Sequence, residues 1–265
     1  MNKKTWITIF LLTVLTFAGA HEFWLHPSSF FFKRGDRLLV SFKVGENFIG
    51  EPWDLKKNRV EKLELHHLSK SINLTDSVKE GDKENLTYTL KEEGTLLLTM
   101  QSSNAFIELD AEKFNAYLKE DGLEEVLEHR IKTNTNSNAA KEFYSRYTKL
   151  LVQVGDKKDD TFKKVVGFPI EIIPDRNPYA LQVGDPIKFK ILAKGKPLFG
   201  VKVKVWNRFD NRTTIQNIHT EKDGTIEARI SNPGPWMVSV VQMGPSKNPE
   251  ADWQSYWGSL VFGIK

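Results

Sequence analysis

The sequence predicts a mainly β protein of two β-sandwich domains, immunoglobulin-like or prealbumin-like, the first carrying a helical insertion. Three observations lead to this expectation. Most of the chain after residue 20 alternates apolar and polar residues over short stretches, which is the pattern of half-buried strands. Glycine, asparagine and proline separate these stretches at the spacing of turns. A single block has the periodicity of three to four residues that is typical of an amphipathic helix.

The first domain is expected over residues 21–172. Its strand signals are the stretches "DRLLVSFKVG", "VEKLELHHL", "NLTYTL", "GTLLLTMQS" and "AFIELD". The helical block follows them, from Ala111 to Arg130, with apolar residues at i, i+3 and i+4 before and after a break at Gly122. The stretch "KEFYSRYTKLLVQVG" fits a second helix or a strand, so we expect the helical insertion to lie near residues 111–150.

The second domain is expected over residues 173–265. Two prolines and an Asn-Pro pair in "IPDRNPYALQVGD" indicate a boundary near its start. Short strand signals then recur with glycine turns between them, as in "PIKFKILAKG", "TIEARISNPG" and "PWMVSVVQMG". About seven short strands at this spacing favour an immunoglobulin-like or prealbumin-like sandwich.

Residues 1–20 have the pattern of a cleavable secretory signal peptide. A lysine pair precedes an apolar run from Trp6 to Phe17, and Ala18 and Ala20 occupy the positions three and one before a cleavage site. The run is shorter than the ~20 residues of a membrane span, and no later segment approaches that length. We therefore expect a periplasmic protein without a transmembrane segment after cleavage, whose mature chain begins at His21.

A histidine at the mature amino terminus is a potential metal chelate. Its α-amine and ring Nδ1 can bind one ion in a six-membered ring, and nitrogen donors favour copper and nickel by the Irving–Williams order. His26 is the nearest further histidine. The spacing from His21 to His26 is one residue too long for a zinc-protease helix, and Pro27 disfavours a helix there. In "LELHHL", alternation places His67 on the face of Leu63 and Leu65, and His66 on the other face. His67 is therefore a further candidate ligand, although a structural role for each internal histidine remains the simpler interpretation.

Composition excludes several classes of function. There is no cysteine, so disulfides, thiol nucleophiles and zinc ribbons are absent. The formal net charge is only +4 and the charges alternate in sign along the chain, which argues against a nucleic-acid partner. No nucleophile elbow or phosphate-binding glycine loop occurs. These absences favour a binding protein over an enzyme.

Several motifs occur in an order that resembles a known family of exported bacterial proteins. They are "HEFWLHPSSF", "ELDAEKFNAYLKEDGLEEVLEHR", "YSRYTKLL", "GFPIEIIPDRNPYALQVGD", "GKPLFGVKV", "DGTIEARISNPGPWMV" and "DWQSYWGSLVF". The family is a domain of unknown function once labelled as a nickel-uptake substrate-specific component. The resemblance covers nearly the whole mature chain.

The resemblance implies a periplasmic, mostly β protein with a terminal histidine followed by an acid, here His21 and Glu22. It suggests a bound divalent transition metal, nickel, cobalt or copper, and an inner-membrane metal transporter as a partner. Relatives often carry a His-Met pair before the final tryptophan-rich segment, whereas this chain has Gln242 and Met243 there. That departure removes one potential ligand.

The aromatic segment "DWQSYWGSLVF" supports an alternative hypothesis. Trp253, Tyr256 and Trp257 could bind a carbohydrate, a peptide or a membrane-protein partner, making the protein a metal-free binding or scaffold module. The simpler interpretation is that these side chains close the sandwich core. A copper oxidase with a histidine brace is a third hypothesis, for which the sequence supplies no clear second histidine.

Overall fold

The computed structural model describes residues 21–55, 59–81 and 83–265. The expected signal peptide, residues 1–20, lies outside this part of the chain. Strands dominate the described residues, and the longer helices are two in number, so the mainly β class with a helical insertion is confirmed. None of the helices in the described ranges is long and apolar enough to cross a membrane.

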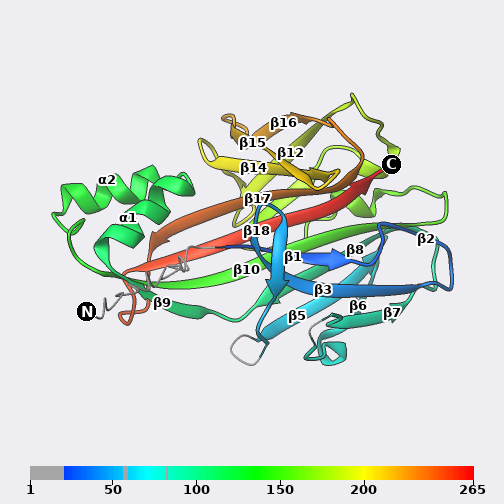
Figure 1. The fold of residues 1–265 in the computed structure, drawn as a ribbon, viewed down its shortest axis with the longest axis horizontal. Helices are drawn as coiled ribbons and strands as arrows, with labels where there is room; N and C mark the ends of the chain where they lie inside the picture. Colours follow the sequence, from blue (N-terminus) through cyan, green and yellow to red (C-terminus); the bar gives the residue numbers. More distant parts are fainter. Residues whose placement is uncertain (1–20, 56–58, 82) are drawn as a thin grey trace, which may run out of the picture.

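A central sheet of ten strands runs through the molecule (Figure 1). Its main path is, in spatial order, β15 (Arg212–His219), β14 (Lys202–Phe209), β17 (Gly234–Pro245), β18 (Trp253–Ile264), β10 (Ala140–Val154), β8 (Gly94–Ser102), β5 (Val60–His67) and β6 (Lys70–Asn73). Two further strands, β2 (Phe31–Phe32) and β9 (Ala105–Leu109), pair with β10. Strands from both halves of the sequence therefore belong to one sheet.

The two halves meet where β10 pairs with β18 in parallel, with Glu142 opposite Trp253 and Leu150 opposite Val261. The expected boundary between residues 172 and 173 falls inside a strand, β11 (Ile170–Pro174). The central sheet contains strands from before and after that boundary, because β10 pairs with β18.

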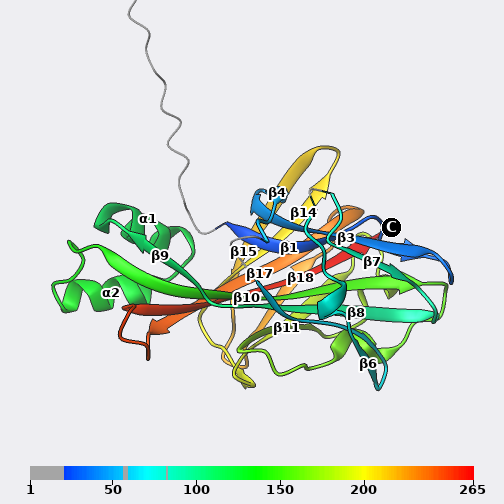
Figure 2. The same cartoon turned by 90° about the horizontal axis from the view of Figure 1, so that it is seen from below.

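Two four-stranded sheets cover opposite faces of the central sheet. One, the amino-terminal sheet, contains β1 (Glu22–Pro27), β3 (Arg37–Glu46), β4 (Ile49–Pro52) and β7 (Leu86–Thr89). The other, the carboxy-terminal sheet, contains β11 (Ile170–Pro174), β12 (Pro186–Ala193), β13 (Lys196–Pro197) and β16 (Thr225–Arg229). Seen from below, β1 and β3 lie on one side of β10 and β18, and β11 lies on the other (Figure 2).

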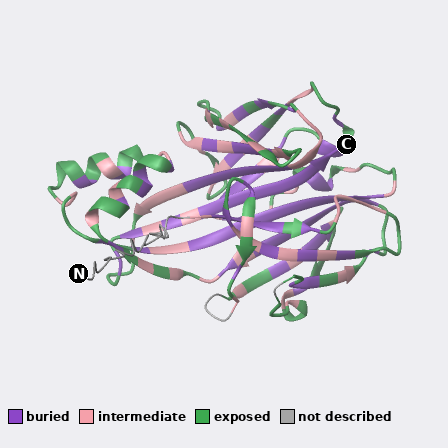
Figure 3. Cartoon of the chain, viewed as in Figure 1, coloured by how far each residue is buried: buried purple, intermediate pink, exposed green. Residues whose placement is uncertain are grey.

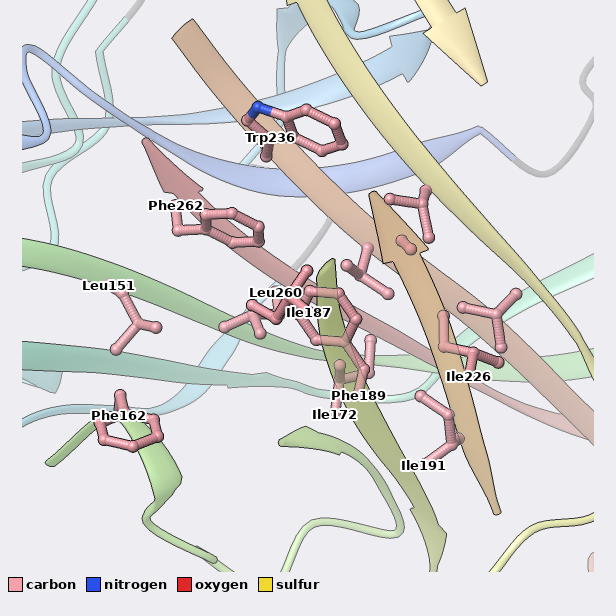
Figure 4. Close-up of a cluster of buried hydrophobic side chains, with 14 of the residues drawn as sticks. Leu151, Phe162, Ile172, Ile187, Phe189, Ile191, Ile226, Trp236, Leu260 and Phe262 are labelled. Carbon is pink, nitrogen blue, oxygen red and sulfur yellow. The ribbon is translucent and has the colours of Figure 1, made fainter. Parts of the chain in front are cut away.

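Side-chain alternation in the middle strands fills two separate cores. Leu150 and Val261 pack towards the amino-terminal sheet, whereas Leu151 and Leu260 pack towards the carboxy-terminal sheet. Adjacent residues of a strand point to opposite faces, so one strand contributes to both cores. Figure 4 shows the second core, in which Trp236 and Phe262 lie near each other. Burial is accordingly concentrated in the central strands, and the hairpins and outer helix surfaces are exposed (Figure 3).

The helical insertion consists of α1 (Ala111–Glu120) and α2 (Glu124–Lys132), which lie at one end of the central sheet (Figure 1). Asp110 begins α1 as its N-cap, accepting a hydrogen bond of 2.9 Å from the Lys113 amide. Gly122 separates the helices with a φ of +72°, and a Cβ there would lie 2.5 Å from Cβ of Lys202. The stretch that fitted a helix or a strand is the strand β10. Three single turns of 3-10 helix complete the described elements: η1 (Thr75–Ser77), η2 (Asp160–Lys163) and η3 (Pro178–Ala180).

Candidate functional site

His21 immediately precedes β1 at the edge of the amino-terminal sheet. Glu22 pairs with Gly45 in the antiparallel register of β1 and β3, so the next position places His21 directly opposite Glu46. Side chains of directly opposed residues lie on the same face. Nε2 of His21 is 3.9 Å from Oε1 of Glu46, and the two side chains are 36% and 56% exposed. The structure thus brings a carboxylate to the residue that begins the expected mature chain.

Glu22 points in the opposite direction, into the protein. It is buried, and its Oε1 lies 3.4 Å from Nζ of Lys204 on β14. The same ammonium group donates to Oδ1 of Asp121, which follows α1, at 2.5 Å. These three residues join the first strand, the helical insertion and the carboxy-terminal half of the chain. Glu22 is thus committed to an internal ion pair, and its carboxylate does not face the side of the strand that carries His21.

Burial changes the acidity of this ionic cluster. Burial raises the pKa of Glu22, although the positive charge of Lys204 opposes the shift. Burial likewise raises the pKa of Asp121 to about 6, again against the charge of Lys204. For Lys204 itself, burial would lower the pKa, but the two carboxylates outweigh it and the net shift is upward. Attraction between Lys204 and the two carboxylates therefore replaces the stabilisation that water gives to exposed charges.

A second buried acid, Glu142 on β10, lies near this cluster. Its Oε1 accepts a hydrogen bond from the Tyr117 hydroxyl at 3.2 Å and another from Ser255. Burial raises the pKa of Glu142 to about 7, and the two hydroxyl hydrogen bonds only partly offset this. Arg146 lies four residues further along β10. Its guanidinium group stacks on aromatic rings, and the guanidinium carbon is 4.9 Å from the Tyr144 ring centre. Alternation in "KEFYSRYTKLLVQV" gave no signal that Glu142 and Arg146 are buried, because their burial depends on strands that cover both faces of β10.

The structure does not bring the other expected ligands to His21. His26 lies five positions along the same strand, roughly 17 Å away at ~3.3 Å per residue, and on the opposite face. His67 ends β5 in the central sheet, where its Nε2 lies 3.3 Å from Oδ2 of Asp159. In the described part of the chain, no three His, Asp or Glu side chains are grouped so as to hold a metal ion by themselves.

Two of the three aromatic residues proposed for partner binding are core residues. Trp253 and Trp257 are 7% and 8% exposed and pack with the helical insertion. Trp257 stacks on Tyr117 with ring centres 6.0 Å apart, and Trp253 meets the His129 ring edge-on. Tyr256 is partly buried against the carboxy-terminal core. The segment therefore offers no exposed indole surface, because both rings close the gap between α1, α2 and the central sheet.

Residues 18–244 match the model of a family described as "Domain of unknown function (DUF4198)". The chain belongs to this family. The match spans both halves of this DUF4198 protein and so includes His21, Glu46 and the ionic cluster. It confirms the resemblance to a family of unknown function, whereas export and the older nickel label stay predictions.

No curated protein matches the sequence. Among solved structures, the three N-terminal domains of the bacteriophage RB49 Highly Immunogenic Outer Capsid protein are 8% identical, with a TM-score of 0.21 over 92% of this chain and 71% of that one. Escherichia coli α2-macroglobulin activated by porcine elastase is 10% identical, with a TM-score of 0.21 over 90% of this chain and 21% of that one. Scores this low do not indicate a shared fold.

Proposed function

We propose that the protein is an exported metal-binding protein whose mature amino terminus binds a divalent transition metal together with Glu46. The observation that carries the proposal is the register of β1 and β3. It sets the Glu46 carboxylate directly across from His21 on a partly exposed face.

The donor set would contain two nitrogens and one or two oxygens. Signal cleavage before His21 would create a free α-amine, which with Nδ1 of the same residue forms a six-membered chelate ring. Glu46 would supply the carboxylate. The imidazole ring of His21, which is partly exposed, would rotate to present Nδ1 to the ion. Such a set follows the Irving–Williams order, so copper is favoured over nickel and cobalt.

Metal uptake or handling is the role that fits this site best. A ligand set on an exposed strand edge can load and release an ion without a conformational change in the core. An inner-membrane metal transporter is the corresponding partner. We propose binding in preference to catalysis because the nearest further histidine of the strand, His26, lies on its opposite face, whereas a histidine brace requires a second histidine on the same ion.

The test compares five forms of the purified mature protein by calorimetric titration with Cu²⁺, Ni²⁺ and Co²⁺. They are the chain beginning at His21, the same chain with one added residue before His21, His21→Ala, Glu46→Gln and the control His26→Ala. Intact mass spectrometry of the exported protein first establishes that processing leaves His21 at the terminus. Cu²⁺ is expected to bind most tightly, and affinity is expected to fall at acid pH as protons compete for the amine and ring.

The added residue and His21→Ala should each reduce Cu²⁺ affinity by more than the ~10–100-fold typical of losing a residue that only orients a ligand. Glu46→Gln should reduce it less, because the nitrogen chelate remains. His26→Ala is the matched control and should bind like the unmodified chain, since His26 lies on the other face. Equal Cu²⁺ binding by the processed and extended chains would exclude the amine as a ligand.

A further inference from the structure

Two adjoining hollows lie near the β6 edge of the central sheet. They are lined by residues of β5, β6 and the turn from β7 to β8. Their volumes are about 200 and 390 Å³, and the larger is within the ~300–1,000 Å³ range of small-molecule sites. Both are lined by His67, Lys70 and Glu92. The hollows therefore form one continuous depression with two parts.

The smaller hollow is apolar. Leu65 and Leu96 are buried side chains of β5 and β8 at its lining, and Ile72 of β6 and Tyr88 of β7 also line it. Ile72 leaves 45% of its surface exposed although it is a large aliphatic side chain. Ile72 and the partly buried Tyr88 therefore leave apolar surface here open to a ligand.

The larger hollow is polar and carries an excess of cations. Arg34, Lys70 and Lys157 line it together with Glu92 and Glu93. Lys91 adds a further ammonium group to the apolar hollow. Four cationic side chains and two carboxylates thus line the depression, and Lys70 and Glu92 line both of its parts.

His67, which lines both hollows, contacts the buried carboxylate of Asp159. Asp159 accepts hydrogen bonds from the amides of Thr161 at 2.9 Å and Thr95 at 3.1 Å, and its Oδ2 lies 3.3 Å from Nε2 of His67. Gly94 permits this contact, because a Cβ there would lie 2.3 Å from that Oδ2 and 2.6 Å from that Nε2. Nε2 of His67 is buried and has no hydrogen-bond partner among the described residues, and His67 lines both hollows together with Lys70.

We propose that this depression binds a small amphipathic anion, such as a medium-chain carboxylate, independently of the metal site. The apolar tail would lie between Leu65, Ile72 and Tyr88. The anionic head would receive charge-assisted hydrogen bonds from Lys70, Arg34 and Lys157. A free molecule fits better than a lipid within a bilayer, because the apolar hollow, at about 200 Å³, is too small for two long acyl chains.

The test uses the mature protein in a metal chelator, so that its outcome does not depend on the amino-terminal site. Octanoate, octanol and butyrate are titrated by isothermal calorimetry or NMR chemical-shift changes. Octanoate should bind roughly tenfold or more tightly than octanol, which lacks the charge, and than butyrate, which has a shorter tail.

Variants locate the site. Lys70→Gln and Lys157→Gln should each weaken octanoate binding about tenfold and leave octanol unaffected. Ile72→Ser should weaken octanoate and octanol alike. Lys188→Gln, an exposed lysine of the carboxy-terminal sheet, is the control and should not change binding. Equal binding of octanoate and octanol, no octanoate binding at all, or binding only to phosphatidylglycerol vesicles would each overturn the proposal.

Discussion

Removing either partner of the Lys149–Glu171 ion pair should lower the free energy of unfolding by ~3–5 kcal/mol. Nζ of Lys149 on β10 lies 2.6 Å from Oε1 of Glu171 on β11, and the two side chains are 2% and 1% exposed. The amides of Val166 and Gly167 also donate to Glu171, at 2.7 and 3.2 Å. Lys149→Met would leave the carboxylate buried with only these amides, and Glu171→Ala would leave an unpaired ammonium group.

Urea unfolding followed by tryptophan fluorescence measures the effect. The double variant Lys149→Met/Glu171→Leu should recover most of the loss, because it removes both charges and leaves none unpaired. Lys188→Ala provides the surface comparison. Its partner Glu227 is 3.6 Å away and both side chains are more than half exposed, so the expected change is ~0–1 kcal/mol. Single variants as stable as the surface control would show that the buried pair does not hold the carboxy-terminal sheet to the central sheet.

Glu142→Gln should become increasingly stabilising, relative to the unmodified protein, as the pH rises from 5 to 8. Burial raises the pKa of Glu142 to about 7 in the folded protein, whereas the unfolded chain loses this proton near pH 4.5. Between these values the folded state holds one more proton than the unfolded state, so the contribution of Glu142 to stability falls with rising pH. The loss is ~1.4 kcal/mol per pH unit, or roughly 3 kcal/mol in all.

A glutamine resembles the protonated acid and can still accept from Tyr117 and Ser255. The variant should therefore match the unmodified protein near pH 5 and exceed its stability by ~3 kcal/mol at pH 8. The neighbouring Asp121, whose pKa burial raises to about 6, is present in both proteins, so the comparison of the two isolates Glu142. Glu227→Gln, at an exposed position, should show no such trend. A stability difference that stays the same at every pH would mean that Glu142 is already ionised in the folded protein at pH 5.

Residue patterns predicted only part of the candidate site. The predicted cleavage site identified His21 as a candidate ligand. Alternation alone could not predict Glu46, because this residue is 25 positions later and lies beside His21 only through strand pairing. Sequence proximity suggested His26 instead, and the strand places it on the opposite face. The family resemblance, a terminal histidine followed by an acid, predicted Glu22 as a further ligand, yet the strand buries it against Lys204.

By itself, the sequence determined most of the strands and the helical block that begins at Ala111, because those patterns depend on neighbours two to four positions apart. It left the stretch that forms β10 open between a helix and a strand. Only the tertiary structure decided that β10 pairs in parallel with β18 and that the two halves share one sheet, since pairing depends on residues more than 100 positions apart. The same pairing buries both faces of β10. Lys149, which alternation alone would place at a surface, consequently lies in the interior and requires Glu171 beside it.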